Sequence, residues 1–201
     1  MQNHEFHGSV LREYDIRGVV GDTLSIADAY AIGRSFGTNL VRDGGTKVAV
    51  GYDGRLSSVD MAKSLVCGLN DAGITALRVG RGPTPMLYFS VYHLPADAGI
   101  MVTGSHNPPD YNGFKMMLGR RPFFGEQILN LGRMAREGDW AAGLGTVEDH
   151  DVRPAYLDKL AGAYTTDTPL SVAWDCGNGA AGDILPDLIA RLPGHHIALN
   201  E

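Results

Sequence analysis

At its centre the chain reads Thr103-Gly104-Ser105-His106-Asn107-Pro108-Pro109-Asp110-Tyr111-Asn112-Gly113-Phe114-Lys115. One apolar run, 98–102, precedes this sequence and a second, 114–118, follows it. Both runs have the length and composition of buried strands. The sequence between them therefore predicts a loop that connects two strands. Asn112-Gly113 is a strong turn signal and is expected to bring the chain back into the second strand.

The side chains of this loop suit a serine that carries a phosphoryl group. Gly104 has no Cβ, so a ligand or another backbone can approach it closely. Ser105 follows a strand end, where functional side chains commonly stand on a rigid scaffold. His106 adds a titratable donor beside the hydroxyl. Lys115 re-enters near the base of the loop, where its ammonium could face Ser105.

Two other interpretations of this serine remain open. The loop could be a turn rich in glycine, proline and asparagine with an ordinary exposed serine, since short motifs often match by chance. Ser105 and His106 could also belong to a serine hydrolase. Against the hydrolase, the loop has no acidic partner that would orient the histidine, and Ser105 does not stand in a Gly-x-Ser-x-Gly elbow.

The composition favours small-molecule chemistry over binding to nucleic acids or membranes. The net charge is −6, and no basic cluster offsets it. No apolar run reaches membrane-spanning length, and the start of the chain lacks the pattern of a signal peptide. Cys67 and Cys176 are isolated from each other, which suits a reducing cytosol and gives no metal-binding pattern. We therefore expect a cytoplasmic protein.

Strand and helix patterns alternate along the chain, which predicts an α/β fold. We expect a three-layer α/β/α domain with a mixed, mainly parallel sheet. Its helices are expected at 25–41, with Ser25 as the N-cap, at 58–72, through 88–92 and at 125–137. Its strands are expected at 47–51, 74–80, 98–102 and 114–118. The segments 6–21 and 138–150 are expected to be irregular.

A domain boundary is expected near Asp151, which gives a first domain at 1–150 and the start of a second, similar domain at 151–201. Within the second domain, 177–182 is a glycine-rich turn that could cradle phosphate or could be structural. In the first domain, Arg55 could support a phosphate or could pair with Asp53 in a structural turn. For Arg55, the structural interpretation is the one we prefer; for the turn at 177–182, the residues leave both open.

The chain resembles the α-D-phosphohexomutases, in their phosphomannomutase/phosphoglucomutase branch. The central sequence looks like the active-serine loop of that family. The phosphoglucosamine mutase branch typically has alanine before the serine, so Thr103-Gly104 points away from it. Four more segments match in kind and order: Tyr14-Asp15-Ile16-Arg17-Gly18, Gly51-Tyr52-Asp53-Gly54-Arg55, Pro83-Thr84-Pro85 and Asp175-Cys176-Gly177-Asn178-Gly179.

The resemblance implies an enzyme that interconverts hexose 1-phosphate and hexose 6-phosphate, with mannose or glucose as the sugar. The phosphoryl group passes through Ser105, and a hexose 1,6-bisphosphate is the intermediate and activator. His106 and Lys115 are the other implied catalytic residues, while Tyr14 and Arg17 are implied to bind substrate.

The resemblance also implies supporting residues and a metal. Thr103, Gly104, Asn107 and Arg55 would support the phosphate-bearing loop. One oxygen of phosphorylated Ser105 would bind Mg²⁺, a hard cation that prefers oxygen ligands.

The family's Asp-Gly-Asp-Gly-Asp-Arg metal loop and its sugar-binding and C-terminal phosphate-binding loops find no counterpart in this sequence. We therefore expect an N-terminal fragment whose partners are a phosphosugar and the remainder of the parent chain, and which has no mutase turnover alone. A non-catalytic fragment that binds sugar phosphates or serves as an interaction module is the alternative.

Overall fold

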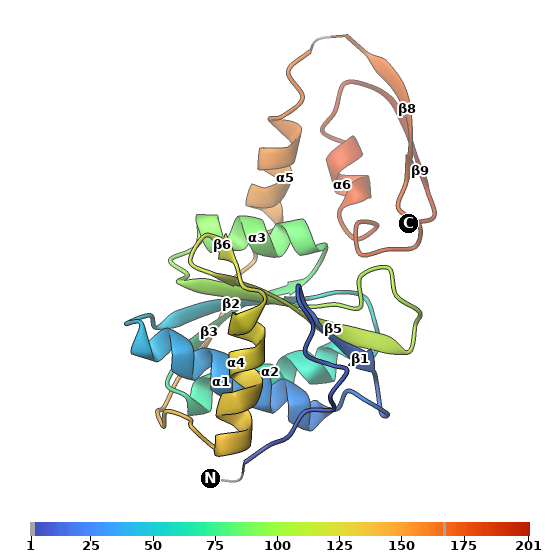
Figure 1. The fold of residues 1–201 in the computed structure, drawn as a ribbon. Coiled ribbons are helices and arrows are strands. Elements are labelled where there is room, and N and C mark those ends of the chain that lie inside the picture. The colour runs from blue at the N-terminus through green and yellow to red at the C-terminus, as the bar shows by residue number, and fades with distance from the viewer. Residues whose placement is uncertain (1–2, 167) are drawn as a thin grey trace.

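The computed structural model describes residues 3–166 and 168–201 (Figure 1). A seven-stranded sheet forms the centre of the larger part, in the order β1-β5-β4-β2-β3-β7, with β6 paired to β5. The strands are β1 (Ile16–Val19), β2 (Lys47–Tyr52), β3 (Thr75–Arg81), β4 (Ala98–Val102), β5 (Tyr111–Leu118), β6 (Arg121–Pro122) and β7 (Val147–Asp149). The pairing pattern makes β5 run against all the other strands of this sheet. The predicted mixed, mainly parallel α/β/α sheet is thus confirmed.

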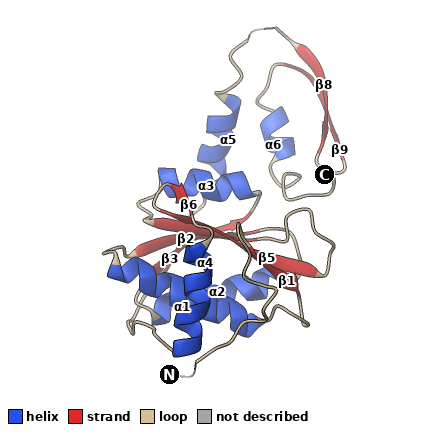
Figure 2. Ribbon diagram, in the orientation of Figure 1, coloured by secondary structure: helices blue, strands red, loops and turns tan. Residues whose placement is uncertain are grey.

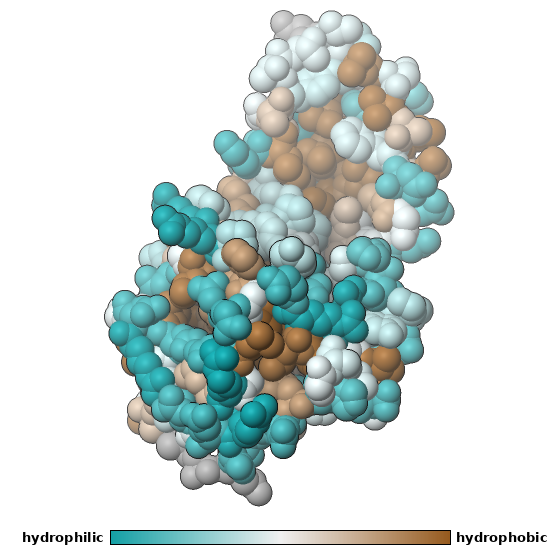
Figure 3. Space-filling view, viewed as in Figure 1, coloured by the Kyte–Doolittle hydropathy of each residue, from teal (hydrophilic) through white to brown (hydrophobic). Residues whose placement is uncertain are grey.

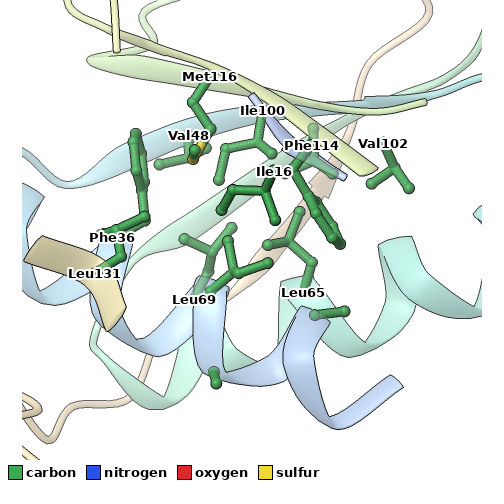
Figure 4. Packing of buried hydrophobic residues seen from close by; sticks show 14 of the residues in the cluster. Ile16, Phe36, Val48, Leu65, Leu69, Ile100, Val102, Phe114, Met116 and Leu131 are labelled. Carbon is green, nitrogen blue, oxygen red and sulfur yellow. The ribbon is translucent and has the colours of Figure 1, made fainter. Parts of the chain in front are cut away.

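Helices cover both faces of the sheet (Figure 2). On one face lie α1 (Ile26–Arg42), α2 (Ser58–Asp71) and α4 (Glu126–Glu137), and on the other lies α3 (Thr84–His93). Ser25 caps α1 as predicted, because its side chain accepts a hydrogen bond from the Asp28 amide and Asp28 bonds back to the Ser25 amide. The three helices and the sheet enclose the main apolar core (Figure 4), which includes Phe36, Leu65 and Phe114.

A smaller part follows β7. It contains α5 (Arg153–Ala161), α6 (Leu185–Ile189) and a parallel pair of strands, β8 (Leu170–Asp175) and β9 (Gly194–Leu199). Tyr156 and Leu157 of α5 pack with Leu87 of α3 in a second core cluster. Figure 3 shows apolar side chains gathered on the surface of this part. The domain boundary near Asp151 stays a prediction; Asp151 lies between β7 and α5.

Two segments expected to be irregular contain strands. Within 6–21, β1 pairs antiparallel with β5, and within 138–150, β7 pairs with β3. Both strands are short and carry polar residues, so they lack the apolar run that marked the other strands. Their pairing depends on partners far away in the sequence.

The predicted turn at Asn112-Gly113 is wrong, because both residues lie inside β5. Asn112 is fully buried, and its side-chain amide donates to the hydroxyls of Ser57 and Ser58 at 2.8 and 2.9 Å. A Cβ at Gly113 would lie 2.1 Å from the Ile16 carbonyl oxygen. Asn112 therefore makes a buried polar contact with the start of α2, and Gly113 allows β1 and β5 to approach each other closely. The chain turns earlier, where the Tyr111 amide bonds to the Pro108 carbonyl.

Within the described residues, no helix combines the length and the apolar character needed to cross a membrane.

Gly33 and Gly68 let α1 and α2 touch backbone to backbone. A Cβ at Gly68 would lie 2.2 Å from the Tyr30 carbonyl oxygen, and one at Gly33 would lie 2.3 Å from that of Leu65. We expect Gly68→Ala to lower the free energy of unfolding by about 3 kcal/mol, because the helices must separate to admit the methyl group. Urea denaturation measures this.

Gly8→Ala is the control, since a Cβ there meets nothing within 4 Å. Equal stability of the two variants would show that the helices do not cross at this distance.

Candidate active site

The predicted serine loop lies between β4 and β5 and faces a cleft of about 960 Å³. Three segments line the cleft: the serine loop with Ser105 and His106, the turn between β2 and α2, and residues 177–183 of the smaller part. The first two follow neighbouring parallel strands, so the carboxyl ends of β2 and β4 bring them together. Ligands of α/β proteins commonly bind at such an edge.

Asp53 joins these two segments. Its carboxylate is buried and accepts hydrogen bonds from Thr103 Oγ1 at 2.8 Å and from the Gly104 amide at 3.0 Å. On its other side it accepts from Ser58 Oγ at 2.5 Å and from the Arg55 amide at 3.1 Å. One carboxylate therefore fixes both the start of the serine loop and the start of α2. A buried charge needs such partners to offset its loss of hydration.

The side chain of Arg55 extends into the serine loop and contacts its backbone. Its Nε is 3.4 Å from Asp53 Oδ2, and a Cβ at Gly104 would lie 2.2 Å from its Cζ. A Cβ at position 104 would therefore force the Arg55 guanidinium to shift. The two terminal nitrogens of the guanidinium donate to four backbone carbonyl oxygens of the loop, those of Ser105, Asn107, Pro108 and Tyr111. This geometry supports the structural interpretation of Arg55, whose donors are taken up by protein.

Ser105 adopts the left-handed backbone conformation, with φ of 54°. This region is costly for a residue with a Cβ and persists only where neighbouring contacts impose it. Here the Ser105 amide donates to Thr103 Oγ1 at 2.9 Å, and the Ser105 carbonyl accepts from Arg55. The side chain is exposed at the cleft, and its Oγ lies 3.4 Å from Nδ1 of His106, a long hydrogen bond.

Of the other predicted residues, Asn107 lines the cleft, whereas Arg17, Lys115 and Tyr14 do not. Arg17 Nη1 donates to Asn107 Oδ1 at 3.0 Å, which ties β1 to the loop. Lys115 Nζ lies 3.4 Å from Asp15 Oδ2. No hydrogen bond joins Lys115 to Ser105 in the part of the chain that the structure describes. Tyr14 is 77% exposed.

The glycine-rich turn across the cleft uses its amides internally. The amides of Gly177, Asn178, Gly179 and Gly182 donate to the Asp175 carboxylate and to the carbonyls of Asn200, Cys176 and Gly179. A phosphate cradle requires free amides, so these bonds favour the structural interpretation. On the same side, Arg81 of β3 donates to Asp183 at 2.6 Å.

The donor set does not fit a magnesium site made by this chain alone. Among the described residues, no group of three or more His, Cys, Asp or Glu side chains could hold a metal ion. Ser105 offers a single oxygen.

Two residues of the site were missed from the sequence. Local sequence relates Asp53 only to Arg55, two residues away, although the carboxyl end of a buried strand is where α/β proteins place ligands. The role of Asp15 is not evident from local sequence, because its contact with Lys115 spans 100 residues.

Arg55→Lys tests the support of the loop. We expect it to lower the free energy of unfolding by roughly 2 kcal/mol, because an ammonium cannot reach four carbonyl oxygens in the plane of a guanidinium. Hydrogen exchange of peptides covering 104–111 should accelerate. Arg12→Lys is the matched control, since Arg12 is exposed and bonds to one carbonyl, that of Ser9. The same exchange rates in both variants would contradict the assignment.

Comparison with known proteins extends these observations. The model of the family described as phosphoglucomutase/phosphomannomutase, alpha/beta/alpha domain I, matches residues 8–130. A phosphomannomutase/phosphoglucomutase of Pseudomonas aeruginosa is 46% identical over 92% of this chain and 40% of its own length. A phosphoglucomutase of Neisseria gonorrhoeae is 42% identical over 86% of this chain and 38% of its own length. This chain thus spans about two fifths of the curated relatives it matches.

Solved structures agree with the sequence relatives. The crystal structure of a phosphoglucomutase/phosphomannomutase family protein from Burkholderia thailandensis superposes with a TM-score of 0.92 at 38% identity, and covers 97% of this chain and 44% of the other. The match to the family model includes β1, the Asp53 turn and the whole serine loop. This chain belongs to the phosphoglucomutase/phosphomannomutase family, of which it contains domain I.

Proposed function

We propose that this chain supplies the active serine of a phosphohexomutase that interconverts hexose 1-phosphate and hexose 6-phosphate, with mannose, glucose or both as the sugar. The observation that carries the proposal is the conformation of Ser105. A network of hydrogen bonds, anchored on the buried Asp53 carboxylate, holds this residue in a left-handed backbone conformation and leaves its hydroxyl facing a cleft. A fixed nucleophile is what phosphoryl transfer requires, since its catalysis consists mainly of positioning and charge stabilisation.

In the proposed reaction, the Oγ–P bond of phosphorylated Ser105 breaks as a bond forms between phosphorus and a sugar hydroxyl oxygen. The proton released by the sugar hydroxyl passes, with the assistance of Lys115, to the Ser105 oxygen, which thereby becomes a hydroxyl again. The resulting hexose 1,6-bisphosphate returns its other phosphoryl group to Ser105 by the reverse chemistry. His106 lies within 3.4 Å of Oγ and would stabilise the transferring group, and Lys115 would supply a second cation.

The remaining residues have supporting roles in this proposal. Tyr14 and Arg17 would contact substrate from the β1 side. Thr103, Gly104, Asn107 and Arg55 would hold the shape of the loop rather than bind the phosphate themselves. Mg²⁺ would take one oxygen of phosphorylated Ser105 as a ligand and neutralise charge on the phosphoryl group. The parent protein would provide the other metal ligands and the sugar-binding segments, in a cytoplasmic setting.

The hydrolase interpretation has little support in the geometry. Among the described residues, no carboxylate bonds to His106. The chain contains one Gly-x-Ser-x-Gly sequence, at 33–37, but it lies inside α1. Its Ser35 is fully buried and accepts a hydrogen bond from Trp140 Nε1 at 2.8 Å.

The proposal predicts covalent phosphate on Ser105. Intact-mass measurement and phosphopeptide mapping should find one phosphoryl group on Ser105 after incubation of the protein with glucose 1,6-bisphosphate and Mg²⁺. Ser105→Ala should take up none. Because the described residues of this chain include no group of side chains that could hold a metal ion, the mapping is made on this chain and on the complete gene product.

An unmodified Ser105 in both proteins would contradict the mutase proposal. If glucose 1-phosphate nevertheless bound saturably, that result would favour the non-catalytic sugar-phosphate binding alternative.

A further inference from the structure

Three charged side chains lie on one face of the sheet beside the serine loop. In the antiparallel pair β1–β5, Ile16 is opposite Phe114 and Arg17 is opposite Gly113. Ile16 and Phe114 are fully buried in the main core. Because side chains alternate along a strand, Arg17 and Lys115 point to the opposite face. Asp15, directly before β1, meets Lys115 there.

The Asp15 carboxylate lies between two cations. Its Oδ2 is 3.4 Å from Lys115 Nζ, and its Oδ1 is 3.9 Å from Arg17 Nε. The Asp15 side chain is 17% exposed, so water and salt screen these pairs less than pairs at the open surface. Arg17 Nε is buried and donates no hydrogen bond among the described residues. The orientation of Arg17 thus depends on Asp15 and on Asn107.

This group of charges is connected to the active serine. Arg17 donates to Asn107 Oδ1, and Asn107 Nδ2 donates to the Gly104 carbonyl at 2.7 Å. The carboxylate is therefore joined, through Arg17 and Asn107, to the residue that precedes Ser105.

We propose that Asp15 is a positioning residue that holds the cations of Lys115 and Arg17 together beside the serine loop, where both serve an incoming phosphoryl group. Without this carboxylate, the two like charges repel each other and the flexible lysine side chain turns to solvent. This inference rests on the proposed function. It assigns a role to a residue that makes no contact with substrate itself.

Removing a carboxylate makes the site more positive. We therefore expect the variant to bind a phosphate ester at least as well as the wild type, while it loses the fixed geometry of Lys115. If Asp15 only supported the fold, its replacement would instead weaken the binding of the phosphate ester as well as disturb Lys115.

The test is NMR of the lysine ammonium groups in this chain. The lysines are Lys47, Lys63, Lys115 and Lys159, so each signal can be assigned by replacing one lysine with arginine. In Asp15→Asn we expect the Lys115 ammonium protons to exchange with water about threefold faster, the ratio expected for loss of a partly exposed ion pair. Asp15→Glu keeps the charge and should restore slow exchange.

Asp60→Asn is the matched control. It removes the exposed partner of Lys63, 3.0 Å away, and should leave the Lys115 signal unchanged. The wild-type spectrum decides the question even if Asp15→Asn does not fold. Lys115 should exchange more slowly than Lys159, which makes no ion pair among the described residues.

Titration with glucose 1-phosphate then tests the proposed function separately from the positioning role of Asp15. The dissociation constant of Asp15→Asn should not rise above that of the wild type. Equal ammonium exchange in Asp15→Asn and wild type, or exchange in the wild type as fast as that of Lys159, would overturn the role of Asp15. The titration is repeated on the complete gene product, which would carry the sugar-binding segments. A complete wild-type protein that does not respond to glucose 1-phosphate would count against the proposed function alone, because the ammonium exchange in this chain still decides the role of Asp15.

Discussion

The hydrogen bonds of the buried Asp53 carboxylate determine where Ser105 lies. Its four hydrogen bonds reach two segments that are 50 residues apart in the sequence. Because the carboxylate is charged and buried, every one of these donors offsets its lost hydration, and none can be removed cheaply. These hydrogen bonds hold the segments that follow β2 and β4 together at one side of the cleft.

The serine loop consists of strained backbone held by side chains from elsewhere. Four of its carbonyl oxygens converge on one guanidinium, and its central residue is left-handed. A loop that lacks its own repeating hydrogen bonds needs such an external template. Arg55 thus supplies the hydrogen bonds to the loop carbonyls that a neighbouring strand would supply in a sheet. The Ser105 side chain is thereby oriented without lying on a helix or strand of its own.

Local patterns were sufficient for most of the scaffold and for the loop. The capping pair Ser25 and Asp28 located α1, and an uninterrupted apolar run located β4. Local patterns failed at Asn112-Gly113, where the turn signal was overruled by burial against α2. They also could not assign the roles of Asp53 and Asp15, because the contacts of Asp53 with the serine loop and of Asp15 with Lys115 span 50 to 100 positions. Such contacts follow from the order of strands in the sheet, which periodicity does not give.

β1 joins the sheet through β5, and the resulting contact between Asp15 and Lys115 closes a chain segment of 100 residues. Contacts of such long sequence separation form late in folding, since the entropy of closing the segment must first be overcome. We infer that the nucleophile and the cations beside it are assembled at different times. The Asp53 network is complete once β2, α2 and β4 have met, whereas the β1 flank docks afterwards. A partly folded chain would therefore carry a formed serine loop before it has the electrostatic environment for chemistry.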